Sequence, residues 1–214
     1  MSDYAGIVCL ANSVKLKHFC FAGVRVETYE WIRPIGAGPN GAVLREEQEL
    51  DDGGIAALLD VVEVPLADPI PEPGQPENWS IADGRWIRTG SLEPADALTL
   101  LENLVTDESL FGNRGKAVPA SVVEEKGVPA SLTVVRPREI TWRKGADGRV
   151  SAIFEHADRE LDLKVTDPEW TPQFSDDEPG DYVIEGGAPT FLTVSLADEW
   201  EGWHTKLVAG VIQL

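Results

Sequence analysis

Residues 7–23 read Ile7-Val-Cys-Leu-Ala-Asn-Ser-Val-Lys-Leu-Lys-His-Phe-Cys-Phe-Ala-Gly23, two short apolar runs on either side of a polar segment. Short apolar runs bounded by polar residues are typical of buried strands. The runs 7–11 and 19–23 therefore predict a β-hairpin. Its turn is expected to hold Asn12, Ser13, Lys15 and Lys17.

Similar strand patterns continue along the whole chain. Residues 150–154 and 161–165 alternate apolar and polar side chains, the period of a half-buried strand. The intervening residues 156–159 are expected to form a hairpin turn, and the run 206–212 is apolar enough for a central strand. The remaining strands are expected in the ranges 31–35, 58–65, 132–135, 140–143 and 191–195.

Helix signals are sparse in comparison. Ser91 is expected to cap a helix whose first turn contains Pro94. A second short helix is expected near Asp167-Pro-Glu169. The apolar positions that share one face of the first helix are Ala97, Leu101 and Leu104.

About five short strands in each half, with few helices, predict a mostly β fold. The strand count favours two tandem OB-fold-like antiparallel barrels with one or two short helices. Five prolines between Pro65 and Pro76 indicate an insertion, and the Gly- and Pro-containing residues 111–119 mark a break. We therefore expect a first barrel with the proline-rich insertion and helix at 1–110, and a second barrel at 111–214.

Composition excludes several classes of protein. Of 214 residues 43% are hydrophobic, which argues against wholesale disorder, and no apolar run approaches a membrane span. The net charge of −19 argues against a protein that coats DNA with its whole surface. The first residues lack the basic region of a signal peptide, so we expect a cytoplasmic protein.

The two cysteines, Cys9 and Cys20, are too few for a disulfide scaffold. If the first hairpin turns between Val14 and Lys15, they lie directly opposite each other. Paired reduced thiols in the core are the preferred interpretation, and a disulfide or a zinc site with His18 are the alternatives.

Catalytic motifs are absent from the sequence. It holds no G-x-S-x-G, no P-loop and no H-E-x-x-H, and Gly36-Ala-Gly-Pro-Asn-Gly41 reads as a tight turn. His18 and Cys20 share a strand face, which leaves a reactive thiol open as an alternative to a structural cysteine. We predict no catalytic residue, no cofactor and no metal.

Basic, amide and tryptophan side chains form two groups. No acid occurs from Tyr4 to Val26, and bases outnumber acids in residues 126–154. Cations beside aromatic faces are the components of a single-strand nucleic-acid groove. The expected ligand-binding residues of the first barrel are Asn12, Ser13, Lys15, Trp31, Arg33, Asn78 and Trp79. The second basic island comprises Arg136, Arg138, Trp142, Arg143 and Lys144.

Several strings resemble the prokaryotic dual OB-containing domain family: Cys9-Leu-Ala-Asn-Ser13, Trp31-Ile-Arg-Pro34, Gln75-Pro-Glu-Asn-Trp79, Thr166-Asp-Pro-Glu169 and Trp200-Glu-Gly-Trp-His204. The resemblance runs through the whole chain in order. It implies two consecutive OB barrels, a nucleic-acid- or nucleotide-binding role and a link to bacterial conflict or defence systems. It supplies no catalytic residues.

The favoured hypothesis is therefore a non-catalytic tandem OB module that binds single-stranded nucleic acid or a nucleotide in a cleft. A protein–protein adaptor, with a partner encoded nearby, is the first alternative, because net charge opposes nucleic acid. An enzyme that uses Cys20 or His18 is the second. No membrane association is expected.

Overall fold

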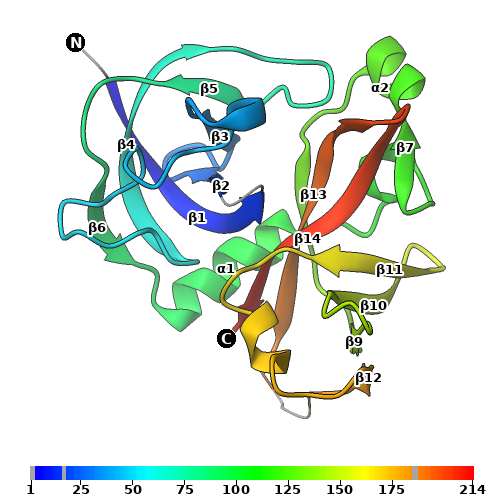
Figure 1. Cartoon of the computed structure of the whole chain (residues 1–214). Helices are drawn as coiled ribbons and strands as arrows, with labels where there is room; N and C mark the ends of the chain where they lie inside the picture. Colours follow the sequence, from blue (N-terminus) through cyan, green and yellow to red (C-terminus); the bar gives the residue numbers. More distant parts are fainter. Residues whose placement is uncertain (1–2, 16–17, 185–187) are drawn as a thin grey trace.

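The first sheet closes into a barrel. The computed structural model describes residues 3–15, 18–184 and 188–214 (Figure 1). The strand order is β1-β2-β3-β5-β4, and β4 pairs again with β1, which closes a five-stranded OB barrel with β6 on the edge of β4. The six strands of this sheet are β1 (Asp3–Lys15), β2 (His18–Arg25), β3 (Trp31–Ile35), β4 (Asp60–Pro69), β5 (Asn78–Ile81) and β6 (Ile87–Ser91).

Alternating apolar side chains fill this barrel. Ile7 and Cys9 of β1 point into the same core as Ile32 of β3. Phe21 packs edge-on against Trp86 with ring centroids 4.8 Å apart, and both rings are fully buried. Because successive residues of a strand face opposite sides, the neighbours of these residues on β1 and β2 point out of the barrel.

The second sheet follows the same plan but does not close. Its order is β12-β9-β10-β11-β14-β13-β8, with β7 paired to β14. β8 and β9 occupy the place of one strand, interrupted at 136–140, where Pro137 cannot donate a ladder hydrogen bond. The strands are β7 (Ala117–Pro119), β8 (Leu132–Val135), β9 (Thr141–Lys144), β10 (Val150–His156), β11 (Arg159–Val165), β12 (Gly180–Tyr182), β13 (Thr190–Trp200) and β14 (Trp203–Gln213).

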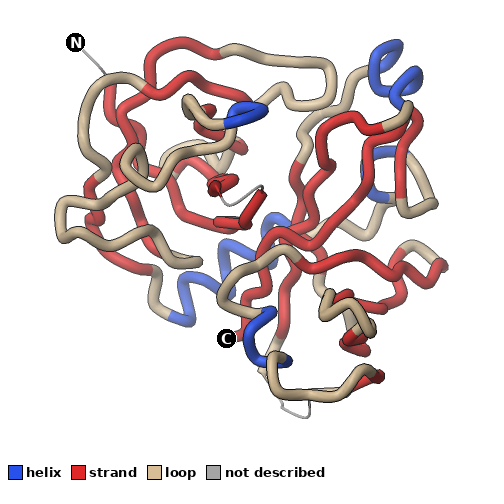
Figure 2. Tube along the Cα trace, viewed as in Figure 1, coloured by secondary structure: helices blue, strands red, loops and turns tan. Residues whose placement is uncertain are grey.

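The expected mostly β fold with two OB barrels is confirmed, and so are the hairpin turn at 156–159 and the central position of the last strand. Strands β3 and β5 run parallel, as do β11 and β14. Figure 2 shows that the long connection between β3 and β4 is mostly loop, interrupted by the short turn η1 (Pro39–Gly41).

The helices differ in detail from the prediction. The first, α1 (Pro94–Leu104), has Glu93 rather than Ser91 at its N-cap position, because Ser91 ends β6 and its hydroxyl donates to Asp60. No α-helix begins at Asp167, where a turn leads into the 3-10 helix η3 (Thr171–Phe174). The helix α2 (Ala120–Lys126) and the 3-10 turn η2 (Leu110–Gly112) were not predicted, nor were the short strands β5, β6, β7 and β12.

Outward side chains of both barrels meet in a second layer of core. Val8 and Leu10 of β1 pack with Phe191 and Ile212 of the second sheet, and α1 covers this layer with its leucines. The backbones of β1 and β14 come so close that a Cβ at Gly210 would lie 2.5 Å from the carbonyl oxygen of Leu10. Only glycine fits there without a shift of the main chain.

A buried polar network joins the same two barrels. The Glu77 carboxylate, with its side chain 3% exposed, accepts hydrogen bonds from the backbone N–H and hydroxyl of Ser131. Arg33 Nε lies 3.6 Å from Glu77 Oε1, and Arg33 Nη2 donates to Ser131 Oγ at 2.8 Å and to Ser195 Oγ at 3.1 Å. Each barrel thus supplies half of the network.

The proline-rich loop also contacts the second barrel. Val128 donates its N–H to the Pro73 carbonyl at 3.1 Å, and Gln75 Nε2 donates to Asp198 Oδ1 at 2.8 Å. Val14 of β1 donates to the Thr166 carbonyl. Because contacts of all kinds cross between the sheets, a division into domains at residue 110 stays a prediction.

The predicted pairing of Cys9 with Cys20 is wrong. Cys9 pairs with Gly23, and Cys20 pairs with Ser13, because the hairpin turns later than expected and a bulge at Leu10 shifts the register. No disulfide joins Cys9 to Cys20, and this register also separates the two cysteines that were proposed as zinc ligands. Cys9 is fully buried, and burial raises the pKa of its thiol.

Lys206 of β14 is an unusual core residue. Its side chain is 1% exposed, and its ammonium donates to the Asn113 carbonyl at 2.5 Å. Burial lowers the pKa of the lysine to about 8, because the interior disfavours the charged form.

The polar network predicts the effect of an arginine deletion. Arg33→Met leaves the Glu77 carboxylate buried without its cation, so we expect the free energy of unfolding to fall by about 3–5 kcal/mol. Adding Glu77→Gln should restore part of this loss, because the amide oxygen still accepts from Ser131. Urea titrations of the single and double variants measure both changes. The exposed Arg45→Met is the control, and an effect of Arg33→Met no larger than this control contradicts the assignment.

The two thiols should react at different rates. Because Cys9 is buried and its thiol stays protonated, a polar alkylating reagent should modify half-buried Cys20 much faster in the native protein. Mass spectrometry of the alkylated peptides measures the two rates, and both thiols should react in urea. Equal native rates would refute the position of Cys9.

Lys206 predicts a pH dependence of stability. The folded-state pKa of about 8 lies below the unfolded value near 10.5, so the unfolded chain holds more protons between these values. The free energy of unfolding should therefore rise as pH increases from 8 to 10.5. Lys206→Met should remove this part of the rise. Urea unfolding of both proteins across this range checks it, and equal slopes would count against the buried ammonium.

Candidate nucleotide-binding site

A cavity of about 870 Å³ lies at the seam where the second barrel fails to close. We call it the seam pocket. The broken strand supplies one wall and the segments on either side of residues 185–187 supply another. The lining residues are Arg136, Pro137, Arg138, Glu139, Ile140, Thr141, Trp142, Trp170, Val183, Ile184, Ala188, Pro189, Thr190 and Gln213.

Aromatic rings form the floor of the seam pocket. Trp142 of β9 and Trp170 pack with ring centroids 4.7 Å apart, and Phe174 lies behind Trp142. Asp167 positions Trp170, because its Oδ1 accepts from the N–H groups of Glu169 and Trp170 while Oδ2 accepts from Val211 of β14. Both tryptophans are nearly buried, so they stiffen the floor more than they offer faces for stacking.

Two arginines line the seam pocket, and both lie in the segment that separates β8 from β9. Arg136 forms an ion pair with Glu102 of α1, and its guanidinium lies 5.4 Å from the centroid of the Phe191 ring. Arg138 is exposed and forms no ion pair with any described residue. Glu139 is the carboxylate beside them in the lining. The arginines offer planar donors that suit phosphate oxygens.

The other members of the second basic island are engaged elsewhere. Arg143 binds Asp181 through Nε and Nη2, at 2.7 and 3.0 Å. Lys144 donates to the carbonyls of Phe174, Ser175 and Asp177, which tie β9 to the end of η3. Of the cations in the second basic island, Arg136 and Arg138 therefore line the seam pocket, whereas Arg143 and Lys144 hold β9 to neighbouring segments.

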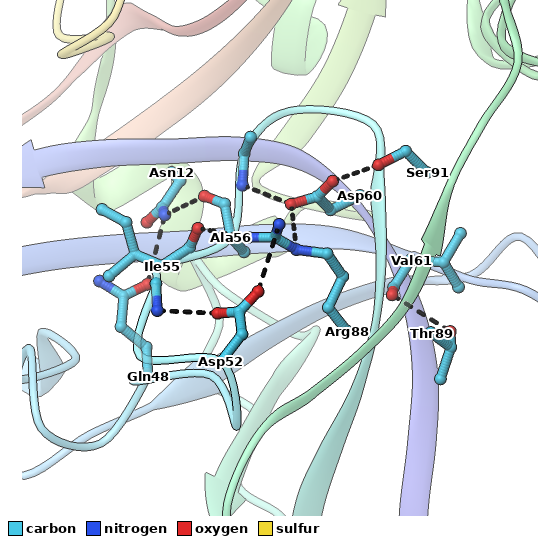
Figure 3. A network of polar contacts seen from close by, with 12 residues as sticks. Asn12, Gln48, Asp52, Ile55, Ala56, Asp60, Val61, Arg88, Thr89 and Ser91 are labelled. Carbon is cyan, nitrogen blue, oxygen red and sulfur yellow. Dashed lines mark hydrogen bonds and ion pairs between the residues drawn. The ribbon is translucent and has the colours of Figure 1, made fainter.

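Asn12 and Ser13 lie inside β1 rather than in the hairpin turn. Both are buried, and Asn12 Nδ2 donates to Gln48 Oε1 at 3.2 Å and to the Ala56 carbonyl at 2.8 Å. Figure 3 shows this amide pair beside a network in which Arg88 contacts Asp52 and Asp60. The sequence suggested a turn at Asn12 because the partners of its side chain lie far away along the chain.

The remaining first-barrel residues are distributed along the junction and the barrel wall. Trp31 and Arg33 share a face of β3, as expected, and that face meets the second barrel. Asn78 is buried and donates to Gln75, while Arg25 lies 5.0 Å over the ring of half-buried Trp79. Lys15 ends β1, and its side chain lies outside what the structure describes, as does Lys17.

The junction therefore uses the surface that OB barrels commonly offer to ligands. That surface consists of the face of the second and third strands with the adjoining loops. Here Ala22 and Trp31, from β2 and β3, pack against Leu132 and Ala209. The proline-rich loop between β4 and β5 lies against the second barrel too.

Several lining residues were not predicted. Ile140, Val183 and Ile184 supply apolar surface, and Val183 is 69% exposed. The run Tyr182-Val-Ile184 is short, and its only sequence signal is apolar residues in an otherwise acidic segment. Val183 and Ile184 line the same cavity as Arg138, which lies in the interruption between β8 and β9.

Three other cavities suit an anion less well. One of about 550 Å³, between the proline-rich loop and α2, is lined by Glu72, Glu124, Asp198 and Glu199. A second of about 260 Å³ beside α1 is largely apolar. A third, beside Arg114, has a volume of only about 10 Å³. Size and charge together favour the seam pocket.

Within the described ranges, no group of three or more histidine, cysteine or acidic side chains is arranged to hold a metal. In the same ranges, no helix combines the length and apolar character needed to cross a membrane.

Comparison with known families agrees with the strand topology. The family model described as the dual OB-containing domain matches residues 5–211, nearly the whole chain. Searches among curated proteins and among solved structures gave no significant match. The match covers nearly the whole chain, and it agrees with the closed OB barrel and the second sheet of the same plan. The chain therefore belongs to the dual OB-containing domain family.

Proposed function

We propose that this protein is a non-catalytic module that binds a nucleotide, or the end of a single-stranded nucleic acid, in the seam pocket. The observation that carries the proposal is the pairing of Arg136 and Arg138 with apolar surface in one cavity of about 870 Å³. Pockets of roughly 300–1,000 Å³ enclose small organic ligands, and their few polar groups set orientation. Phosphate would meet the arginines and a base would meet Ile140 and Val183.

The size of the cavity favours an end or a free nucleotide over the interior of a strand. Strand-tracking OB surfaces are long grooves with several cations and exposed stacking rings. The usual groove face of the first barrel is covered here, and the aromatic floor of the seam pocket is nearly buried. A net charge of −19 opposes additional phosphates outside the pocket.

A protein–protein adaptor is the second candidate. Trp200 and Trp203 face each other across the tip of the β13–β14 hairpin and are 74% and 50% exposed. Exposed aromatic pairs of this kind are common at protein contacts. A partner encoded nearby and a role in bacterial defence would fit the adaptor and the nucleotide-binding module equally.

A thiol-dependent enzyme is the weakest of the candidates. Cys9 is buried and its pKa is raised, which makes it a poor nucleophile. Cys20 and His18 lie on β2 of the first barrel, whereas the seam pocket belongs to the second barrel.

The proposal predicts the result of removing one arginine. Arg138→Ala should weaken binding about ten-fold or more, because a hydrogen bond to a charged group contributes about 1.5–3 kcal/mol. The probes are the four ribonucleoside 5′-monophosphates and single strands of about eight nucleotides, DNA and RNA. Calorimetry at low salt measures affinity, and the salt slope for the strands should fall by about 0.7.

Arg45→Ala, which removes an exposed arginine of the first barrel, is the matched control and should leave binding unchanged. Both variants should melt close to the parent, since neither arginine is buried. If the parent binds none of the probes at low salt, the binding function is wrong and the adaptor is favoured. If Arg138→Ala binds as the parent does, the site lies elsewhere.

A further inference from the structure

The ion pair between Arg136 and Glu102 links the seam pocket to helix α1. Arg136 follows β8 directly, and Glu102 lies in the last turns of α1. The main chain keeps them adjacent, because Val105 bridges to Val134 of β8 and Thr106 donates its N–H to the Val134 carbonyl at 3.0 Å. Glu102 therefore reaches Arg136 from a helix outside the pocket lining.

The helix that carries Glu102 is fixed independently of this ion pair. Ala97, Leu100 and Leu101 are buried, and the two leucines belong to the core layer between the barrels. Both members of the ion pair are 44% exposed, so the pair itself adds little to stability. The pair can open without moving α1.

Among the described residues, Arg136 is one of two cations that line the seam pocket, and one of its terminal nitrogens already contacts a carboxylate. A phosphate that enters the pocket meets Arg138, Glu139 and this occupied guanidinium. Two anions near one arginine repel each other, so the phosphate has to displace Glu102 or bind beside its charge. An uncharged ligand has no such competition.

We propose that Glu102 is a built-in competitor for the seam pocket, which holds Arg136 until a phosphate-bearing ligand takes its place. This inference rests on the proposed function of the pocket and adds its regulation. The competition selects for ligands with enough negative charge to win Arg136 from the carboxylate. It also couples occupancy of the pocket by a phosphate to the surface of α1, because a phosphate that takes Arg136 releases the Glu102 side chain.

The test compares Glu102→Gln with Asp96→Asn. Asp96 is an exposed carboxylate of the same helix, six residues before Glu102, so its variant loses the same charge without touching Arg136. The probes are uridine 5′-monophosphate and uridine, which differ by the phosphate. Calorimetry at low salt measures both affinities for each protein.

Glu102→Gln should bind the monophosphate about two- to five-fold more tightly than the parent, the range that an exposed ion pair of about 0.4–1 kcal/mol allows. Its affinity for uridine should not change, and Asp96→Asn should match the parent with both probes. Thermal melting of all three proteins checks that they remain folded.

The outcomes separate the two proposals. Unchanged or weaker binding of the monophosphate by Glu102→Gln, with the parent binding it, overturns the competition and leaves the pocket intact. Equal tightening of uridine, or equal tightening in Asp96→Asn, also overturns it. If neither the parent nor Glu102→Gln binds the monophosphate, the proposed function of the pocket fails and this inference fails with it.

Discussion

The close contact between β1 and β14 determines how the two barrels sit on each other. Gly210 leaves room for the carbonyl of Leu10, and the strands on either side bring a continuous apolar layer together. A buried Glu77 is acceptable within this layer only because Ser131 and Arg33 satisfy it from both barrels. The apolar layer drives the contact, while the charged network favours one relative orientation.

This junction has a consequence for ligand binding. The outward face of β2 and β3, which OB barrels commonly use, contributes Ala22 and Trp31 to the contact instead. The second barrel contributes β13, β14 and β8 to the contact. The strand is interrupted directly after β8, around Pro137, and the seam pocket lies at that interruption.

The net charge of this protein does not predict where an anion could bind, because each cation has its own set of contacts. Arg143 holds β9 to β12, Lys144 holds β9 to the segment before β12, and Arg88 neutralises buried Asp60. Arg136 is shared between a helix and the seam pocket, and Arg138 projects from the pocket lining. An acidic surface around a small basic site opposes nonspecific binding of long polyanions, while leaving one site where an anion is stabilised.

The sequence by itself determined the mostly β class, the two-barrel architecture and the strands with clear alternation, such as β10 and β11. These features depend on local periodicity, which a single chain displays directly. The strings shared with the dual OB-containing domain family were also readable, and the second basic island contains three residues that line the seam pocket, Arg136, Arg138 and Trp142.

Tertiary structure alone decided the register of the first hairpin and the role of each polar residue. Asn12 looks like a turn residue, but its Nδ2 donates to Gln48 Oε1 and to the Ala56 carbonyl, both more than thirty positions away. Arg33 looks like a ligand-binding cation until Glu77 and two serines of the second barrel surround it. Local sequence encodes propensity, but the partner of a buried polar group is chosen by long-range packing, which periodicity does not contain.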